Sequence, residues 1–361
     1  MIGFPVVFPV LAILLLAALC WLLFGAGRRD FRWIAPPPAP DEARGQAMRN
    51  TIFIPTPSGD RIEAWLYRPA GPPAPVILMA PGLCGTKEGP LERFAEGFAD
   101  AGYAVLAFDF RSFGGSEGRL RHSIDLRAHV ADYRAAIAHV RAGNISGLDA
   151  SRVILWGTSF SGASATCAAA ADPVDAVILH VPYLGRPGSQ PGLVQMIGYI
   201  GLAFGEIAGN AIAGLIGVKL PPAYITAYCR PGERAFAPSR DCISRRGEQG
   251  LHPFWKTVPH TYRGGWRNLM LVRDLQHLEA IKPEAALQDL RCPILLLAAR
   301  KDDMIAIGDT RQIASRAPFA RLTEIDAGHF DPYVDPYFAP NLATQIDFLR
   351  EALPQTKTGA A

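Results

Sequence analysis

The 361-residue sequence lacks the signatures of several common functional classes. Its six cysteines show no C-x-x-C spacing, so neither a zinc site nor a disulfide framework is predicted. H-E-x-x-H is absent, and the stretch from Gly82 to Lys87 is too short for a nucleotide-binding P-loop. The formal net charge is only +3 without a long basic run, so nucleic-acid binding is not expected. We therefore expect a protein without a metal or other cofactor.

The most informative stretch runs from Val153 to Gly162, where an apolar segment stops at Ser159 among small residues. This pattern predicts a buried strand that ends in a nucleophile elbow, a sharp turn from strand to helix that exposes the serine. The Ala-rich stretch after Gly162 predicts a helix whose N-terminus is directed at Ser159. Such a helix end supplies N–H groups and a positive dipole where an oxyanion would form.

Strand and helix patterns alternate on both sides of this elbow. Short apolar strands are predicted at 76–80, 103–109, 176–180 and 293–299, with helices at 91–101 and 161–171 between some of them. An opening hairpin is predicted at 52–67. The fold class is therefore α/β, with a doubly wound, mostly parallel sheet whose two parts span 51–181 and 291–355.

Residues 182–290 interrupt this alternation and are predicted to form a helical cap, because a plain loop of that length would be exceptional. Within the cap, the stretch from Met196 to Val218 is nearly uncharged and carries glycines at four-residue spacing. A second membrane span is one reading of this stretch. We prefer cap helices, because one crossing here would leave Ser159 and the chain beyond the cap on opposite sides of the bilayer.

The first residues predict a membrane anchor. Ile2 to Phe24 contain no charged residue and are long enough to cross a bilayer, so 1–25 is predicted as a transmembrane helix. Arg28, Arg29 and Arg32 follow it, which favours an uncleaved single-pass anchor with the catalytic domain in the cytoplasm. Residues 26–50 are predicted as a Pro-rich linker, and 356–361 as a disordered tail. The oligomeric state is left open.

A catalytic serine needs a base, and the base needs a carboxylate that fixes its orientation. For this type of elbow the chain order is serine, acid, histidine. Of the eight histidines, His329 follows the last predicted strand and a glycine. Asp302 comes after the strand at 293–299 and is the favoured acid, with Asp303 as the alternative acid and Asp326 as a weaker third.

Two further features complete the expected site. Its oxyanion hole requires two backbone donors, for which we predict the N–H groups of Phe160 and Leu83. His180 follows the strand after the elbow and is the one other histidine that we single out. The remaining histidines are expected to be structural or to lie on the surface.

These residues together resemble the α/β-hydrolase superfamily, over about Thr51 to Leu353. The closest likeness is to the esterase and dienelactone-hydrolase-like branch, which is related to fungal polyketide acyltransferases and thiohydrolases. It rests on phrases similar to W-G-T-S-F-S-G, to P-G-L with a following G-T, to F-R-S-F-G, and to G-H-F-D with a following Tyr. The resemblance implies Ser159 as nucleophile, His329 as base and Asp302 as acid, with the cap shaping the substrate pocket.

The sequence departs from this family pattern in two places. The hydrophobic anchor is not part of the usual catalytic unit. Ala306-Ile307 replaces the proline that often follows the acid, which leaves the choice between Asp302 and Asp303 open.

We therefore expect a membrane-tethered serine hydrolase that cleaves a small-molecule carboxylic ester or thioester with a lipophilic part. An acyltransferase or a serine peptidase could use the same three side chains. A non-catalytic binding protein of the same fold is a further alternative, which the full set of catalytic residue types disfavours. No motif in the cap identifies the substrate.

Overall fold

The computed structural model describes residues 12, 15–16, 18–19, 21, 27–28, 42–44, 47–185, 193–229, 236–242, 252–258, 266–277 and 280–353. Most of the anchor predicted at 1–25 and all of the tail predicted at 356–361 lie outside these residues. No helix within the described ranges is both long enough and apolar enough to cross a membrane.

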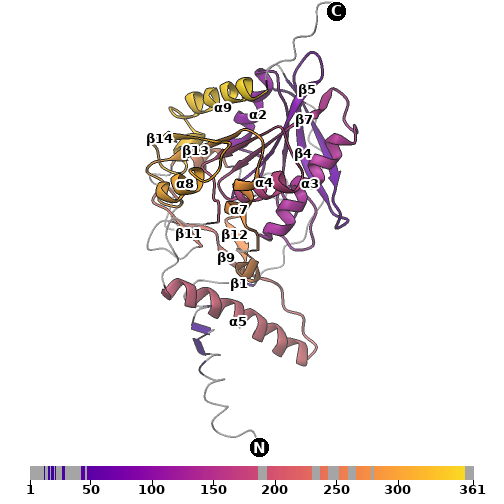
Figure 1. Ribbon diagram of the computed structural model, residues 1–361. Coiled ribbons are helices and arrows are strands. Elements are labelled where there is room, and N and C mark those ends of the chain that lie inside the picture. Colours follow the sequence, from indigo (N-terminus) through magenta and orange to yellow (C-terminus); the bar gives the residue numbers. More distant parts are fainter. Residues whose placement is uncertain are drawn as a thin grey trace, which may run out of the picture.

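A nine-stranded sheet forms the centre of the molecule, which confirms the predicted α/β class (Figure 1). Six neighbouring strands are parallel. In spatial order they are β14 (Ala320–Ile325), β13 (Ile294–Ala299), β8 (Ala176–His180), β7 (Leu148–Thr158), β5 (Ala74–Ala80) and β6 (Ala104–Phe108). The sheet continues through three antiparallel strands, β4 (Arg61–Arg68), β3 (Ala47–Pro55) and β2 (Glu42–Arg44). Central strands such as β5 and β13 are apolar along their whole length, as expected for strands with both faces covered.

Helices cover both faces of the sheet (Figure 1). One face packs against α2 (Pro90–Asp100) and α9 (Phe338–Ala352), and the other against α3 (Leu126–Arg141), α4 (Phe160–Ala171) and α8 (Ile307–Ala314). Alternate residues of one strand therefore enter different cores: Ile77 and Met79 face α2, whereas Val76 and Leu78 face α3 and α4. This sandwich holds the carboxyl ends of the parallel strands in a fixed arrangement.

The segment predicted as a helical cap contains short strands as well as helices. It consists of α5 (Leu193–Leu215), β9 (Ala223–Thr226), β10 (Tyr228–Cys229), β11 (Ala237–Pro238), α6 (Pro253–Thr257), β12 (Leu269–Leu271), the 3-10 helix η1 (Val272–His277) and α7 (Pro283–Asp289). β9 pairs with β12 and also with β1 (Gly27–Arg28). The predicted linker at 26–50 thus contains β1, β2 and the start of β3: β1 pairs with β9, which is distant in the sequence, whereas β2 pairs with the nearby β3.

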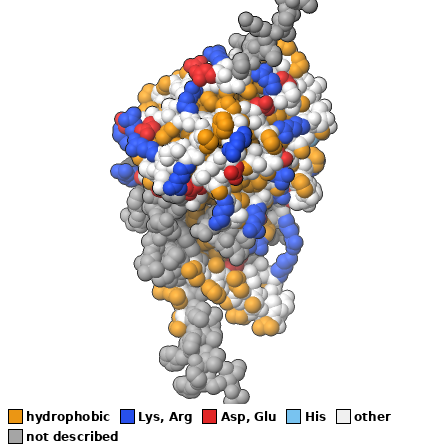
Figure 2. All heavy atoms as spheres, in the orientation of Figure 1, with side chains coloured by type: hydrophobic (Ala, Val, Ile, Leu, Met, Phe, Trp, Pro, Cys, Tyr) orange, Lys and Arg blue, Asp and Glu red, His pale blue; other side chains and the backbone are white. Residues whose placement is uncertain are grey.

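One face of α5 is exposed and apolar. Ile200, Phe204 and Ile207 follow one another at three- and four-residue spacing and are 51%, 55% and 62% exposed, while Leu215 is 87% exposed. Figure 2 shows hydrophobic side chains gathered on the part of the surface where α5 lies. Leu202, on the opposite side of the helix, is buried, so α5 packs against the rest of the fold through that side.

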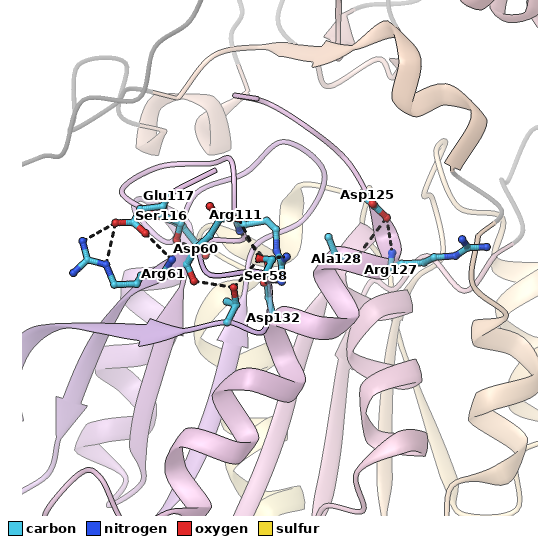
Figure 3. A network of polar contacts seen from close by, with 12 residues as sticks. Ser58, Asp60, Arg61, Arg111, Ser116, Glu117, Asp125, Arg127, Ala128 and Asp132 are labelled. Carbon is cyan, nitrogen blue, oxygen red and sulfur yellow. Dashed lines mark hydrogen bonds and ion pairs between the residues drawn. The ribbon is translucent and has the colours of Figure 1, made fainter. Parts of the chain in front are cut away.

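Ion pairs fix the loop that follows β6 (Figure 3). The guanidinium group of Arg111 donates to Asp132 on α3 and also to the hydroxyl of Ser58. Nearby, Arg61 at the start of β4 donates to Glu117 through its backbone and its side chain. The loop from Arg111 to Glu117 is thus tied to both β4 and α3.

Candidate active site

Ser159 lies at the sharp turn between β7 and α4. Its φ of 49° and ψ of −120° place it in a strained region that a non-glycine residue seldom adopts. The turn leaves no room for side chains nearby: a Cβ atom on Gly157 would lie 2.8 Å from the Cβ of Ala165, and one on Gly162 would lie 2.7 Å from the Cβ of Pro182. These contacts explain why small residues flank the serine.

The structure brings Ser159, His329 and Asp302 together in one hydrogen-bonded chain. The distance from His329 Nε2 to Ser159 Oγ is 3.0 Å, and the distance from His329 Nδ1 to Asp302 Oδ2 is 2.6 Å. The other oxygen of Asp302 accepts hydrogen bonds of 2.8 Å from the backbone N–H groups of Met304 and Ile305. With Asp302 fixed in this way, Nδ1 of His329 is the protonated nitrogen and Nε2 is free to accept the serine proton.

The other two candidate carboxylates lie elsewhere. Asp303 accepts hydrogen bonds from the hydroxyl of Ser239 and the backbone N–H of Arg240, both in the cap. Asp326 forms an exposed ion pair with Lys301, at 2.9 Å. Neither is within the hydrogen-bonded chain of the serine.

His180 lies beneath the elbow, where it takes part in a buried hydrogen-bond network. Its Nδ1 is 3.0 Å from the hydroxyl of Thr158, and its Nε2 accepts a hydrogen bond from the amide of Asn341 on α9. The chain of bonds continues from Asn341 through Gln345 to the indole of Trp156. Burial, with a smaller effect of the nearby His329, lowers the pKa of His180 to about 3, so the imidazole is neutral.

The two predicted oxyanion donors come from different parts of the fold. Phe160 is the first residue of α4, so its N–H has no acceptor within the helix. The loop that carries Leu83 approaches Ser159 closely, because a Cβ atom on Gly82 would lie 3.1 Å from the Cβ of Ser159. From the cap, the hydroxyl of Tyr228 donates to the carbonyl oxygen of Leu83 at 2.8 Å and fixes the orientation of this loop.

A small pocket with a cavity volume of about 50 Å³ opens at Ser159 and His329. Its cap side consists of aromatic and aliphatic side chains, namely Tyr228, Phe254, Trp255, Val258 and Trp266. The sheet side contributes residues of the loop before α2, among them Thr86 and Glu88. A mainly apolar pocket with a few polar groups suits a small molecule that carries a lipophilic part.

Sequence reasoning missed the pocket residues Tyr228, Trp255 and Glu88. No local motif marks them, because they reach the site only through the packing of the cap and of the loop before α2. Within the described ranges no group of three or more His, Cys, Asp or Glu side chains is placed to hold a metal ion.

Comparison with known proteins gives a family match. The family described as serine aminopeptidase, S33, matches residues 71–328. The quorum-quenching protein AidA of Acinetobacter baumannii is 31% identical over 298 residues, which cover 81% of this chain and 92% of that protein. A thiohydrolase of Eupenicillium brefeldianum is 33% identical over 129 residues, which cover 36% of this chain and 41% of that protein.

A third relative is similar in both sequence and structure. The polyketide transferase GrgF of Penicillium is 29% identical over 142 residues, which cover 39% of this chain and 47% of that protein. The crystal structure of the α/β hydrolase GrgF has a TM-score of 0.65 at 20% identity and covers 84% of this chain and 98% of that one, which shows the shared fold. Because the family match spans most of the sequence, the chain belongs to the serine aminopeptidase S33 family and is an α/β-hydrolase enzyme.

Proposed function

We propose that the protein hydrolyses a carboxylic ester or thioester with a lipophilic part through an acyl-enzyme intermediate on Ser159. The observation that carries the proposal is the hydrogen-bonded chain from Ser159 through His329 to Asp302 at the floor of an aromatic pocket. The relative named as a thiohydrolase supports thioesters as one substrate class.

The reaction has two steps. Ser159 Oγ attacks the carbonyl carbon while His329 Nε2 takes its proton, and the N–H groups of Phe160 and Leu83 stabilise the oxyanion. The leaving alcohol or thiol then receives that proton, and the acyl group remains on Ser159. Water attacks the acyl-enzyme with His329 as base, which releases the acid and restores the serine.

A panel of 4-nitrophenyl esters and matching thioesters with increasing acyl length tests this function. Ser159→Ala should lower kcat by about 1,000-fold or more, because the nucleophile is lost. Ser315→Ala, on an exposed serine after α8, is the matched control and should leave kcat unchanged. Retention of more than about a tenth of the activity in Ser159→Ala would refute the assignment.

A second candidate function is acyl transfer to an alcohol or amine in place of water. The similarity to a protein named as a polyketide transferase favours it. If transfer is the main reaction, addition of an acceptor should yield the acylated acceptor and increase the rate of acyl-enzyme breakdown. Amide substrates in the same assay test the peptidase alternative, and ester-containing quorum-sensing signals test the activity that the name of AidA suggests.

We further propose that the protein is tethered to a membrane by residues 2–24, with its catalytic domain in the cytoplasm. The uncharged segment and the arginines after it support this location. The exposed apolar face of α5 is compatible with a position close to lipid.

A further inference from the structure

The pocket at Ser159 contains a buried carboxyl group that the proposed reaction does not use. Glu88 lines the same pocket as Ser159 and His329, yet only 4% of its surface is exposed. Its Oε1 atom has no hydrogen-bond partner in the described part of the chain. A buried, unpaired polar atom is costly, so a group that persists in this state requires an explanation.

The adjacent Lys87 does not serve as the partner of Glu88. The ammonium group of Lys87 lies 2.8 Å from Glu63 Oε1 and 2.6 Å from Asp109 Oδ2, and all three side chains are fully buried. Because Lys87 already pairs with two carboxylates, a third negative charge beside this cluster is unfavourable.

Glu88 is therefore neutral at physiological pH. Burial, reinforced by the negative charge of Asp109, raises the pKa of Glu88 to about 9; Lys87 opposes this shift, while Glu63 and Glu92 add to it. A protonated carboxyl group has an O–H donor and a carbonyl acceptor. It can bind an uncharged polar group without leaving an unpaired charge in the pocket.

The apolar surroundings of Glu88 indicate how its protonated carboxyl group would affect ligand binding. Most of the side chains around it are apolar, including Leu83, Leu91, Trp255 and Phe330. A purely hydrocarbon ligand would fill this space but leave the O–H of Glu88 without a partner. A site with a buried donor discriminates against ligands that cannot pair with it.

We propose that Glu88 is a specificity-determining residue whose neutral carboxyl group hydrogen-bonds a keto or hydroxyl oxygen on the substrate. This inference rests on the proposed hydrolysis of an ester or thioester. It narrows the substrate class to esters or thioesters whose lipophilic part carries an uncharged oxygen substituent.

Matched substrates test the proposal. Thioesters and 4-nitrophenyl esters of one chain length, with a keto group at successive positions, are compared with the unsubstituted acyl chain. For the wild-type enzyme, kcat/KM should be about tenfold or more higher for at least one keto position, which is the range for pairing a buried donor. If kcat/KM for the keto-substituted and unsubstituted substrates were nearly equal at every position, the proposal would be overturned.

Three variants identify the group responsible. Glu88→Gln keeps a neutral donor of similar shape and should retain the preference to within about threefold, whereas Glu88→Leu should abolish it. Glu92→Gln neutralises a nearby acid outside the pocket and should leave the ratio unchanged. An equal preference in Glu88→Leu, or a preference for amine-substituted chains that Glu88→Gln removes, would contradict a neutral hydrogen-bonding role.

A binding assay separates this inference from the proposed function. Non-hydrolysable ligands with and without the additional keto group can be titrated into Ser159→Ala. The fluorescence of Trp255 and Trp266, which line the pocket, reports binding. A preference that depends on Glu88, together with no turnover of any ester, would refute only the proposed function. Turnover without any such preference would refute only the role of Glu88.

The pH dependence of this binding provides a third readout. As pH rises through about 9, Glu88 loses its proton and can no longer donate to a keto oxygen. The preference for the keto ligand should then disappear in Glu88 proteins and persist in Glu88→Gln. The pKa of Glu88 also depends on the charges of Lys87, Glu63, Asp109 and Glu92. The pocket is lined, in addition, by the titratable side chains of His329, Tyr228 and Tyr333. All of these residues remain in Glu88→Gln, so this variant controls for their titration.

Discussion

Two neighbouring aspartates after β13 have different tasks. Asp302 points to His329 and is fixed by two backbone N–H groups, whereas Asp303 is bonded to the cap through Ser239 and Arg240. One carboxylate therefore orients the imidazole, and the other holds the cap against the core.

This difference predicts that Asp302→Asn mainly affects activity and that Asp303→Asn mainly affects stability. Asp302→Asn should lower kcat by about 1,000- to 10,000-fold, because an amide in place of the carboxylate favours the wrong imidazole tautomer. Asp303→Asn should reduce kcat less than about tenfold but lower the melting temperature. Steady-state kinetics and thermal unfolding of both variants measure this, and the reverse ranking of activities would show that Asp303 is the acid.

The sequence predicts the residues of the site better than it predicts their environment. Ser159 and His329 are identifiable because each follows a strong strand pattern in the order that an elbow requires. The choice between Asp302 and Asp303 could not be settled, because both follow the same strand and only the contacts of the folded chain distinguish them. Glu88 could not be predicted, since its burial results from a loop and a cap that are distant in sequence.

The elbow is supported from below by a chain of buried hydrogen bonds. Trp156 and Thr158 of β7 are linked to α9 through Gln345, Asn341 and His180. This chain connects the strand before the nucleophile to the last helix of the fold.

Breaking this chain should destabilise the protein. Asn341→Leu leaves His180 Nε2 and the side chain of Gln345 without their partner, which should lower the free energy of unfolding by about 2–3 kcal/mol. Thr344→Ala, on the exposed side of the same helix, is the control and should change it by less than about 0.5 kcal/mol. Urea unfolding gives both values, and equal stabilities would mean that the chain contributes nothing.

His180, in the same chain of hydrogen bonds, makes the stability of the protein sensitive to acid. Burial keeps His180 neutral in the folded protein by lowering its pKa to about 3, whereas in the unfolded chain its pKa is about 6.5. Between these values only the unfolded state binds the proton, so this contribution to stability is complete above pH 6.5 and is lost as pH falls toward 3. Urea midpoints should fall from pH 7 to pH 5, and by a smaller amount in His180→Gln; an equal decrease in both proteins would refute this origin.

At the level of elements, the sequence predicts the core strands and misses the pairing of short segments. Uniformly apolar runs such as the one in β13 indicate a strand by themselves. β1 contains only Gly27 and Arg28, and it becomes a strand only because β9 lies beside it. Local patterns therefore could not distinguish these residues from the predicted Pro-rich linker.

At the level of the whole molecule, we propose that the N-terminal region determines where the protein is located, and we predict that it also contributes to folding. The full-length protein should fractionate with membranes, resist extraction by high salt and dissolve in detergent, because the uncharged segment from Ile2 to Phe24 is proposed to span the bilayer. A chain that starts at Ala26 should leave the membrane pellet in high salt and remain active. Recovery of the full-length protein in the salt-soluble fraction would refute the anchor.

A shorter chain tests the role of the first strands. A chain that starts at Met48 lacks β1 and β2, and with them the pairing to β9 and β3. This chain should have a lower melting temperature than the one that starts at Ala26. Equal melting temperatures would show that residues 26–47 act only as a linker.

The role of Ser159 as nucleophile is tested most directly by the mass of the covalent intermediate. The enzyme is mixed with a 4-nitrophenyl ester that it turns over, quenched in acid within the first turnovers, digested and analysed by mass spectrometry. The peptide containing Ser159 should gain the mass of the acyl group, and the Ser159→Ala variant should show no such adduct. Burst release of nitrophenol without an adduct on this peptide, or an adduct that persists in the variant, would contradict this role.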